Sequence, residues 1–189
     1  MQNDKTTLKD LSFFTADGSG GVFALIDRTT TQVGRDRLRM HLQRPADNYD
    51  RLIEVQQTVK YWVDNDNLWP TGILNGTIVM LEKFFDSADM ASAPPTGVVL
   101  LLNTFFQKVL NKRDYFFTQF SLSHLSDFLK GCTALAAIAT TPGLPTLLHR
   151  ELLAIKDELN HRLTADIMAV NKQTKFPVLA QLGYQARRE

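Results

Sequence analysis

The sequence predicts an all-α protein with a multi-helix core and long, lever-type helices. Three observations support this. Apolar residues recur at spacings of three and four through most of the chain after residue 20. No stretch combines sustained alternation with β-branched residues, as strands require. Of the 189 residues, 44% are hydrophobic and 22% charged, which is typical of a folded globular chain.

The first half of the chain divides at glycine and proline residues. Residues 1–20 form a lead-in segment, and the glycine-rich stretch 17–21 lacks the Gly-Lys-Ser/Thr ending of a phosphate-binding loop, so it predicts a plain turn. A helix follows over 31–44 and stops at Pro45. Asp47 is the expected N-cap of the next helix, which ends near 64–67.

The middle of the chain predicts weaker and shorter helices. A helix over 68–87 carries two glycines, which lower helix stability. After the break at Pro94-Pro95, a helical pattern runs over 98–120, interrupted near 111–114. Another apolar stripe covers 122–139, with Ser121 or Ser123 as its expected N-cap, and 140–145 is a turn.

The most regular pattern predicts one rod-like helix over about 145–171. At 1.5 Å per residue it would be about 40 Å long, and a C-terminal third without such a rod would contradict the prediction. Its stripe consists of Leu148, Leu152, Ile155, Leu159, Leu163, Ile167 and Val170. Together the predicted helices define a helical domain over 21–171. Residues 172–189 are a C-terminal extension in which Phe176-Pro177 predicts an extended stretch.

The charge balance argues against binding nucleic acid through the whole surface. Lys and Arg total 21 against 20 Asp and Glu, so any such contact requires a local basic patch. One cysteine excludes an internal disulfide and a Cys/His zinc cluster. The polar N-terminus and the short apolar run 97–106 predict a soluble, cytoplasmic protein with no membrane contact.

The sequence offers little for catalysis. Glu158-x-x-His161 has the spacing of a di-iron bundle motif, but the required second motif is missing. Ser121, Ser123 and His124 lie close in sequence without a nucleophile elbow, and Cys132 lies on an apolar stripe. A helical-bundle enzyme is therefore an alternative that rests on Glu158 and His161 alone, and we assign no catalytic, cofactor or metal-binding residue.

Two basic clusters are the candidate contact sites. The first is Arg35, Arg37 and Arg39 within the predicted helix 31–44, and the second is Lys108, Lys112 and Arg113 near a predicted turn. Surface ion pairs and solvated charges explain both clusters most simply. The alternative is a docking surface for DNA phosphates or for an acidic partner.

Four segments follow one another near the start of the chain: 7–13 (TLKDLSF), 21–34 (GVFALIDRTTTQVG), 35–45 (RDRLRMHLQRP) and 48–59 (NYDRLIEVQQTV). Together they resemble the start of the core domain of the MutS family of DNA mismatch repair proteins. That domain opens with a threonine-led segment that ends in a leucine. It continues through a helix ending Leu-(Leu/Ile)-Asp, a Thr-x-Thr-x-x-Gly step, a Leu-x-x-x-Leu helix closed by proline and a helix carrying Arg-x-x-x-(Val/Ala)-(Gln/Val). The match runs from Thr7 to Trp62, roughly a third of the chain, with its elements in matching order and spacing.

The resemblance implies a core and lever module (domain III) of a MutS-like protein, whose levers couple an ATPase domain to a DNA-gripping clamp. Asp27, Gly34 and Leu38 would form the core step, and Leu152, Ile155, Leu159 and Leu163 the lever seam. The chain lacks the mismatch-reading Phe-x-Glu wedge and the Gly-x-x-x-x-Gly-Lys-Ser/Thr loop.

The resemblance therefore implies a fragment of a MutS-like protein or a short relative, and a chain that is not an enzyme by itself. An ATPase domain would follow Glu189 in the parent, which would use ATP and Mg, bind double-stranded DNA and form a homodimer. The alternative function is a helical adaptor that binds a protein partner without a DNA role.

Overall fold

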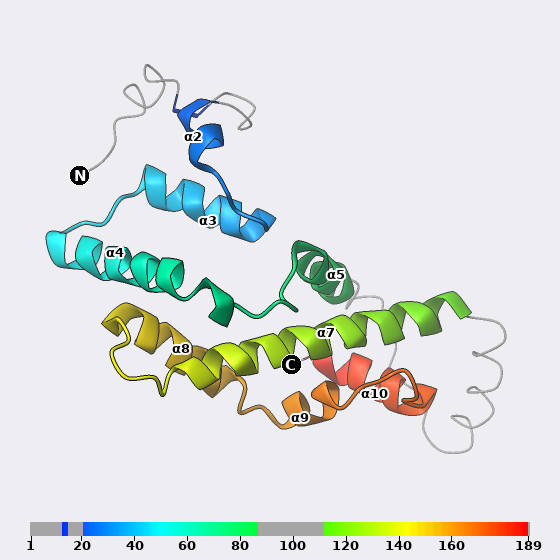
Figure 1. Ribbon diagram of the computed structural model, residues 1–189. Coiled ribbons are helices and arrows are strands. Elements are labelled where there is room, and N and C mark those ends of the chain that lie inside the picture. Colours follow the sequence, from blue (N-terminus) through cyan, green and yellow to red (C-terminus); the bar gives the residue numbers. More distant parts are fainter. Residues whose placement is uncertain (1–12, 15–20, 87–111, 189) are drawn as a thin grey trace. The chain divides into compact units, whose positions relative to one another are not determined.

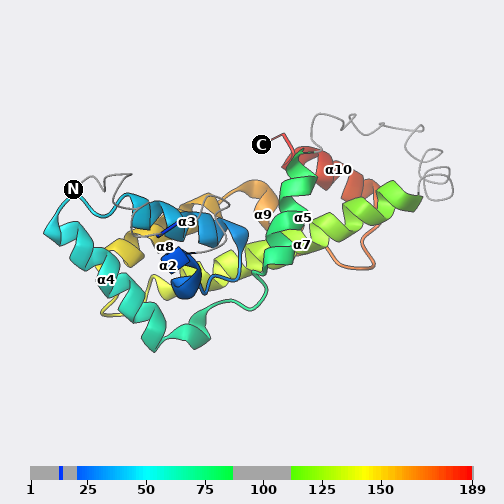
Figure 2. The ribbon, with the colours of Figure 1, turned by 90° about the horizontal axis from the view of Figure 1, so that it is seen from above.

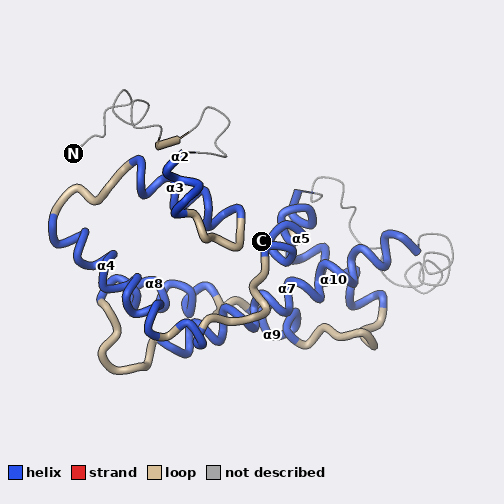
Figure 3. Tube along the Cα trace, turned by 45° about the horizontal axis from the view of Figure 1, so that its top comes forward, coloured by secondary structure: helices blue, strands red, loops and turns tan. Residues whose placement is uncertain are grey.

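A computed structural model describes residues 13–14, 21–86 and 112–188 of the chain (Figure 1). Within these residues every regular element is a helix and none is a strand, which confirms the all-α prediction (Figure 3). The elements are α2 Gly21–Ile26, α3 Gln32–Gln43, α4 Tyr49–Asp64, the 3-10 helix η1 Asp66–Leu68, α5 Asn75–Asp86, α7 Lys112–Ile138, α8 Thr146–Glu158, α9 Arg162–Met168 and α10 Phe176–Ala186.

The chain divides into two compact units. The N-terminal unit comprises Met1–Asp66 together with Gly143–Leu148, and the C-terminal unit comprises Asn67–Pro142 together with His149–Glu189. Helices α2, α3 and α4 belong to the first unit. Helices α5, α7, α9, α10 and most of α8 belong to the second.

Local capping explains the helices of the N-terminal unit. The Thr31 hydroxyl accepts a hydrogen bond from the Gly34 N–H at 3.0 Å and starts α3, which ends before Pro45 as predicted. The N-cap of α4 is Asn48, whose side-chain oxygen accepts from the Arg51 N–H at 2.8 Å. The expectation that Asp47 would cap this helix is wrong by one residue, because asparagine caps a helix as well as aspartate does.

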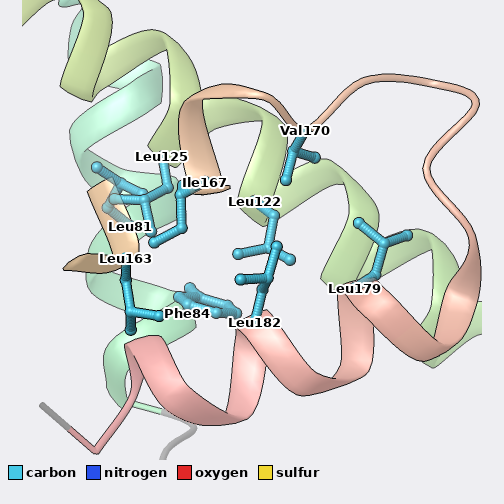
Figure 4. Packing of buried hydrophobic residues seen from close by; sticks show 9 residues of the cluster. All are labelled: Leu81, Phe84, Leu122, Leu125, Leu163, Ile167, Val170, Leu179 and Leu182. Carbon is cyan, nitrogen blue, oxygen red and sulfur yellow. The ribbon is translucent and has the colours of Figure 1, made fainter. Parts of the chain in front are cut away.

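The C-terminal unit is built around α7, and α5, α9 and α10 all contact this long helix (Figure 2). At 1.5 Å per residue, its 27 residues span about 40 Å. The buried side chains between these helices form one cluster (Figure 4): Leu81, Phe84, Leu122, Leu125, Leu163, Ile167, Val170, Leu179 and Leu182.

The expected rod over 145–171 is wrong. Helix α8 ends at Glu158 and α9 begins at Arg162, so the C-terminal third of the chain has no extended rod. At the break, the His161 Nδ1 accepts a hydrogen bond from the Leu163 N–H at 3.3 Å and caps α9. The apolar spacing of four continues across this break, and so the periodicity alone could not reveal it.

The expected serine caps at Ser121 and Ser123 are also wrong. Both residues lie inside α7, whose first turn is formed by Lys112–Asp114. Lysine and arginine are good helix formers, so this polar stretch begins the helix. The rest of the pattern predicted over 98–120, up to residue 111, lies outside the described residues, as do most of the lead-in segment and the Pro94-Pro95 break.

Two further boundaries differ from the prediction. The helix expected over 68–87 starts only at Asn75, after a loop that contains Pro70 and Gly72. The stretch at Phe176-Pro177, expected to be extended, is the first turn of α10, where proline is tolerated because its missing N–H has no helical partner. Leu179 and Leu182 of α10 are buried, so this part of the C-terminal extension belongs to the core.

Candidate functional site

The candidate contact residues separate into described and undescribed groups. Arg35, Arg37 and Arg39 lie on α3, whereas Lys108 lies outside the described residues. Lys112 and Arg113 are the first two residues of α7, and only their backbone is described. The site can therefore be built only on α3 and on the elements that contact it within the N-terminal unit.

Arg35 forms an ion pair with Asp27, the residue that directly follows α2. The Arg35 Nε lies 2.9 Å from Asp27 Oδ2. The other carboxylate oxygen of Asp27 accepts hydrogen bonds from the Thr29 hydroxyl at 2.6 Å and from the Thr29 N–H at 3.0 Å. These bonds from Thr29, together with the positive charges of Arg35 and Arg28, hold the pKa of Asp27 below its usual value. The carboxylate thus fixes the turn between α2 and α3.

Arg39 packs against two aromatic rings. Its guanidinium carbon lies 5.2 Å from the ring centroid of Phe14 and 5.4 Å from that of Phe23, within cation–π distance. Phe23 is 1% exposed, its N–H donates to the Phe13 carbonyl at 3.0 Å, and its ring lies 5.4 Å from that of Phe14. The Arg35 guanidinium also lies 5.8 Å from the Phe23 centroid. Both arginines therefore hold α3 against the aromatic residues.

Arg37 is the exception among the three. It is exposed, and it forms no ion pair with a carboxylate of the described residues. At 100° per residue it lies on the side of α3 opposite Arg35 and Arg39. Only Arg37 of the predicted cluster is thus placed to meet an external partner. Sequence spacing could not separate the three arginines because the position of Phe23 relative to α3 was unknown.

The core step has a steric basis. A Cβ atom added to Gly34 would lie 2.9 Å from the Thr31 hydroxyl oxygen, which is the atom that caps α3. A larger residue there would displace the cap. Leu38, the third residue expected in this step, is half-buried. Asp27, Thr31 and Gly34 thus act together as one structural joint.

The residues tested for catalysis do not form a reactive cluster. Glu158 ends α8 and His161 caps α9, so the two do not share one helical face as a bundle ligand pair would. No group of His, Cys, Asp or Glu suited to a metal ion occurs among the described residues. Burial raises the pKa of the Cys132 thiol, which disfavours its reactive thiolate form.

Two of the three serines of α7, Ser121 and Ser126, are buried, whereas Ser123 is exposed. Ser126 is 1% exposed and donates a hydrogen bond to the Met168 carbonyl at 3.1 Å, which joins α7 to the end of α9. Ser121 is fully buried, and its hydroxyl has no hydrogen-bond partner in the described part of the chain. The hydrogen bond described for these two hydroxyls is thus to a backbone carbonyl, which is a structural role.

Sequence reasoning missed Arg187, which fastens the end of α10 to α5. Its guanidinium carbon lies 4.1 Å from the ring centroid of the buried Phe84, and its Nε donates to the Phe84 carbonyl at 3.2 Å. Burial lowers the pKa of the Arg187 guanidinium. The only signal in the sequence was a pair of basic residues at the end of the chain, which is equally typical of a solvated end.

Two surface hollows in the C-terminal unit were also not predicted. One, of about 570 Å³, is lined mainly by Phe116, Phe117 and Phe120 of α7, with Lys172 at its edge. The other, of about 380 Å³, lies between α9 and α10 and includes Asp166, Gln181 and Gln185. Neither brings together an acid and a base of the kind that general acid–base chemistry uses.

Comparisons of the chain with protein family models, with curated proteins and with solved structures found no match. Among the described residues, no helix is both long enough and apolar enough to cross a membrane.

Proposed function

We propose that this chain is a non-catalytic core and lever module of a MutS-like DNA mismatch repair protein. Its role would be to couple the nucleotide state of a neighbouring ATPase domain to the grip of the parent protein on double-stranded DNA. The observation that carries the proposal is the ordered set of motif segments between Thr7 and Val59.

The geometry of the N-terminal unit supports the proposal by giving the motif residues a common purpose. Asp27 binds Thr29 and Arg35, Thr31 caps α3, and Gly34 keeps that cap accessible. Pro45 then follows the end of α3, and Asn48 starts α4. Each of these motif residues thus has a structural role at the start of α3 or α4, as the proposal expects.

The lever role has to be reassigned within the proposal. The seam of Leu152, Ile155, Leu159 and Leu163 crosses the break between α8 and α9, so it cannot act as one stiff rod. Helix α7 is the better candidate, because it is about 40 Å long and its buried residues pack against α5, α9 and α10. A stiff helix held on several sides transmits a displacement that a loop would absorb.

The reading frame beyond Glu189 provides the first test. A Gly-x-x-x-x-Gly-Lys-Ser/Thr loop within about one domain length would support the proposal. In the parent protein, ATP and Mg would then bind outside this chain. A longer open reading frame without a phosphate-binding loop would contradict the proposed coupling to an ATPase.

A kink in α7 provides the functional test. Ala134→Pro introduces a helix-breaking residue at an exposed position of α7, and Ala134→Ser is the matched control. In the parent protein, the proline variant should lose stimulation of ATP hydrolysis by duplex DNA and keep its basal hydrolysis. Equal stimulation in both variants would argue against α7 as the coupling element.

A second candidate function, a helical protein-binding adaptor, is favoured by one specific observation. Tyr49, Leu52, Val59 and Val63 share one face of α4 and are 74%, 51%, 57% and 71% exposed. Such an apolar stripe is typical of an interface. Salt-dependent binding of duplex DNA by the parent protein would favour the MutS-like function over the adaptor.

A further inference from the structure

The outer face of α3 carries a second pattern that the Asp27 joint does not use. Val33, Arg37 and Met40 of α3 and its C-cap residue Arg44 follow one another at spacings of four, three and four. At 100° per residue these positions fall within a narrow strip, on the side of α3 away from Arg35 and Arg39. We call these four residues the outer strip.

The outer strip is accessible along its whole length. Val33 is 45% and Met40 is 42% exposed, and both arginines are exposed. Neither guanidinium forms an ion pair with a described carboxylate. His41 extends the same side of the helix and is exposed as well. The strip therefore alternates apolar groups with positively charged groups that form no ion pair with a described carboxylate. The one acid at its edge, Asp36, accepts hydrogen bonds from Gln32.

From this alternation we propose that the outer strip docks an amphipathic helix whose apolar residues alternate with carboxylates. A spacing of three and four is the repeat by which one helix packs along another. Leucine-type side chains of the partner would cover Val33 and Met40, and Glu or Asp would pair with Arg37 and Arg44. The two arginines thus require a negatively charged partner, and the spacing of the two apolar residues requires that the partner be an amphipathic helix.

A DNA backbone fits the same strip less well. Phosphates would satisfy Arg37 and Arg44, but they offer no apolar surface to Val33 and Met40. Duplex DNA is therefore the competing occupant in the test. The inference goes beyond the proposed MutS-like function and does not depend on it.

The probe is a synthetic helical peptide in which leucine and glutamate alternate at spacings of three and four residues. Its binding to the full chain is followed by fluorescence anisotropy of a label on the peptide. We expect binding that weakens as NaCl rises from about 50 to about 300 mM. The same peptide with lysine in place of glutamate should not bind. No binding of the glutamate peptide, or equal binding of both peptides, would overturn the proposal.

The double variant Arg37→Glu with Arg44→Glu should weaken binding of the glutamate peptide about tenfold or more. The matched control is Lys60→Glu with Arg150→Glu, which makes the same charge change at exposed positions of α4 and α8 and should leave binding unchanged. Far-UV circular dichroism of each variant verifies that the helices are intact. If both double variants weaken peptide binding equally, the binding is a nonspecific effect of charge and the proposal is overturned.

The double variant Val33→Ser with Met40→Ser separates a protein partner from DNA. It should also weaken binding of the glutamate peptide, because the apolar contacts are lost. If a duplex DNA probe binds instead, with losses in the arginine variant and none in the serine variant, the strip is a phosphate surface. If sedimentation velocity shows a dimer of the full chain that the serine variant abolishes, the occupant is a second copy. Either result would contradict the proposal.

Discussion

The two units are stabilised in different ways. In the C-terminal unit, side chains from α5, α7, α9 and α10 form a continuous apolar core. In the N-terminal unit, α3 and α4 have no buried residue, and Phe23 is the buried residue of α2. Leu147 and Leu148 of its 143–148 segment are also buried. Its other described contacts include two ion pairs, helix caps, aromatic ring pairs and cation–π pairs, each of which typically contributes about 1 kcal/mol. The C-terminal unit can be expected to fold through its own packing, whereas the N-terminal unit depends more on oriented polar groups.

Two tryptophans allow the units to be followed separately. Trp62 lies on α4 in the N-terminal unit, and Trp69 lies in the C-terminal unit. In the Trp69→Phe variant the emission comes from Trp62 and reports on the N-terminal unit. In the Trp62→Phe variant it comes from Trp69 and reports on the C-terminal unit. Urea unfolding of these two single-tryptophan chains is the measurement for each of the predictions below.

Among single substitutions, the largest effect is expected from Phe84→Ala. Phe84 is fully buried and contacts both the cluster and Arg187. Removing the ring should lower the free energy of unfolding of the C-terminal unit by about 3–5 kcal/mol, because a cavity remains. The Trp69 transition should shift and the Trp62 transition should not. Equal shifts would show that the two units unfold as one. Phe84→Leu is the control, and it should cost less because it keeps most of the buried apolar volume.

A glycine pair tests how closely the loop before α5 approaches α7 in the C-terminal unit. At Gly131 of α7, an added Cβ would lie 2.7 Å from Ile73 Cγ1 and 3.4 Å from Pro70 Cβ, whereas Gly76 of α5 has nothing within 4 Å. Gly131→Ala should destabilise the unit by about 1 kcal/mol, since overpacking outweighs the gain in helix propensity. Gly76→Ala should stabilise it by about 0.5 kcal/mol. Stabilisation by both substitutions would mean that Ile73 moves aside without cost.

These core contacts show where the sequence was informative. Most helix positions followed from apolar periodicity, and Thr31, Pro45 and the end of α4 marked boundaries correctly. The predicted boundaries were wrong where apolar periodicity continues through a break, as at His161. They were also wrong where proline is compatible with two structures, because Pro177 could mark either an extended stretch or the first turn of a helix. The site was predicted least well, because the separate roles of Arg35, Arg37 and Arg39 depend on where Phe23 packs.

The N-terminal unit should show an acid sensitivity that one substitution removes. Because the pKa of Asp27 is lowered in the folded state, its contribution to stability is present above the pKa of the unfolded chain, about 3.9. That contribution is lost as the pH falls through the folded-state pKa. Asp27→Asn should therefore lower the Trp62 midpoint at about pH 6 more than at about pH 3. An equal decrease at both values would show that the carboxylate charge is not what binds Arg35.

The smallest effect is expected on the exposed stripe of α4. Leu52 and Val59 are 51% and 57% exposed, so Leu52→Ser with Val59→Ser should change the stability of the N-terminal unit by about 0.5 kcal/mol or less. The same substitutions at two positions of the C-terminal core, Leu122 and Leu179, should unfold that unit. A small effect on α4 would mean that its apolar face is retained for a reason other than stability, as the adaptor function requires. A loss of more than about 2 kcal/mol would instead show that this face is covered in solution, since exposed apolar side chains contribute little to stability.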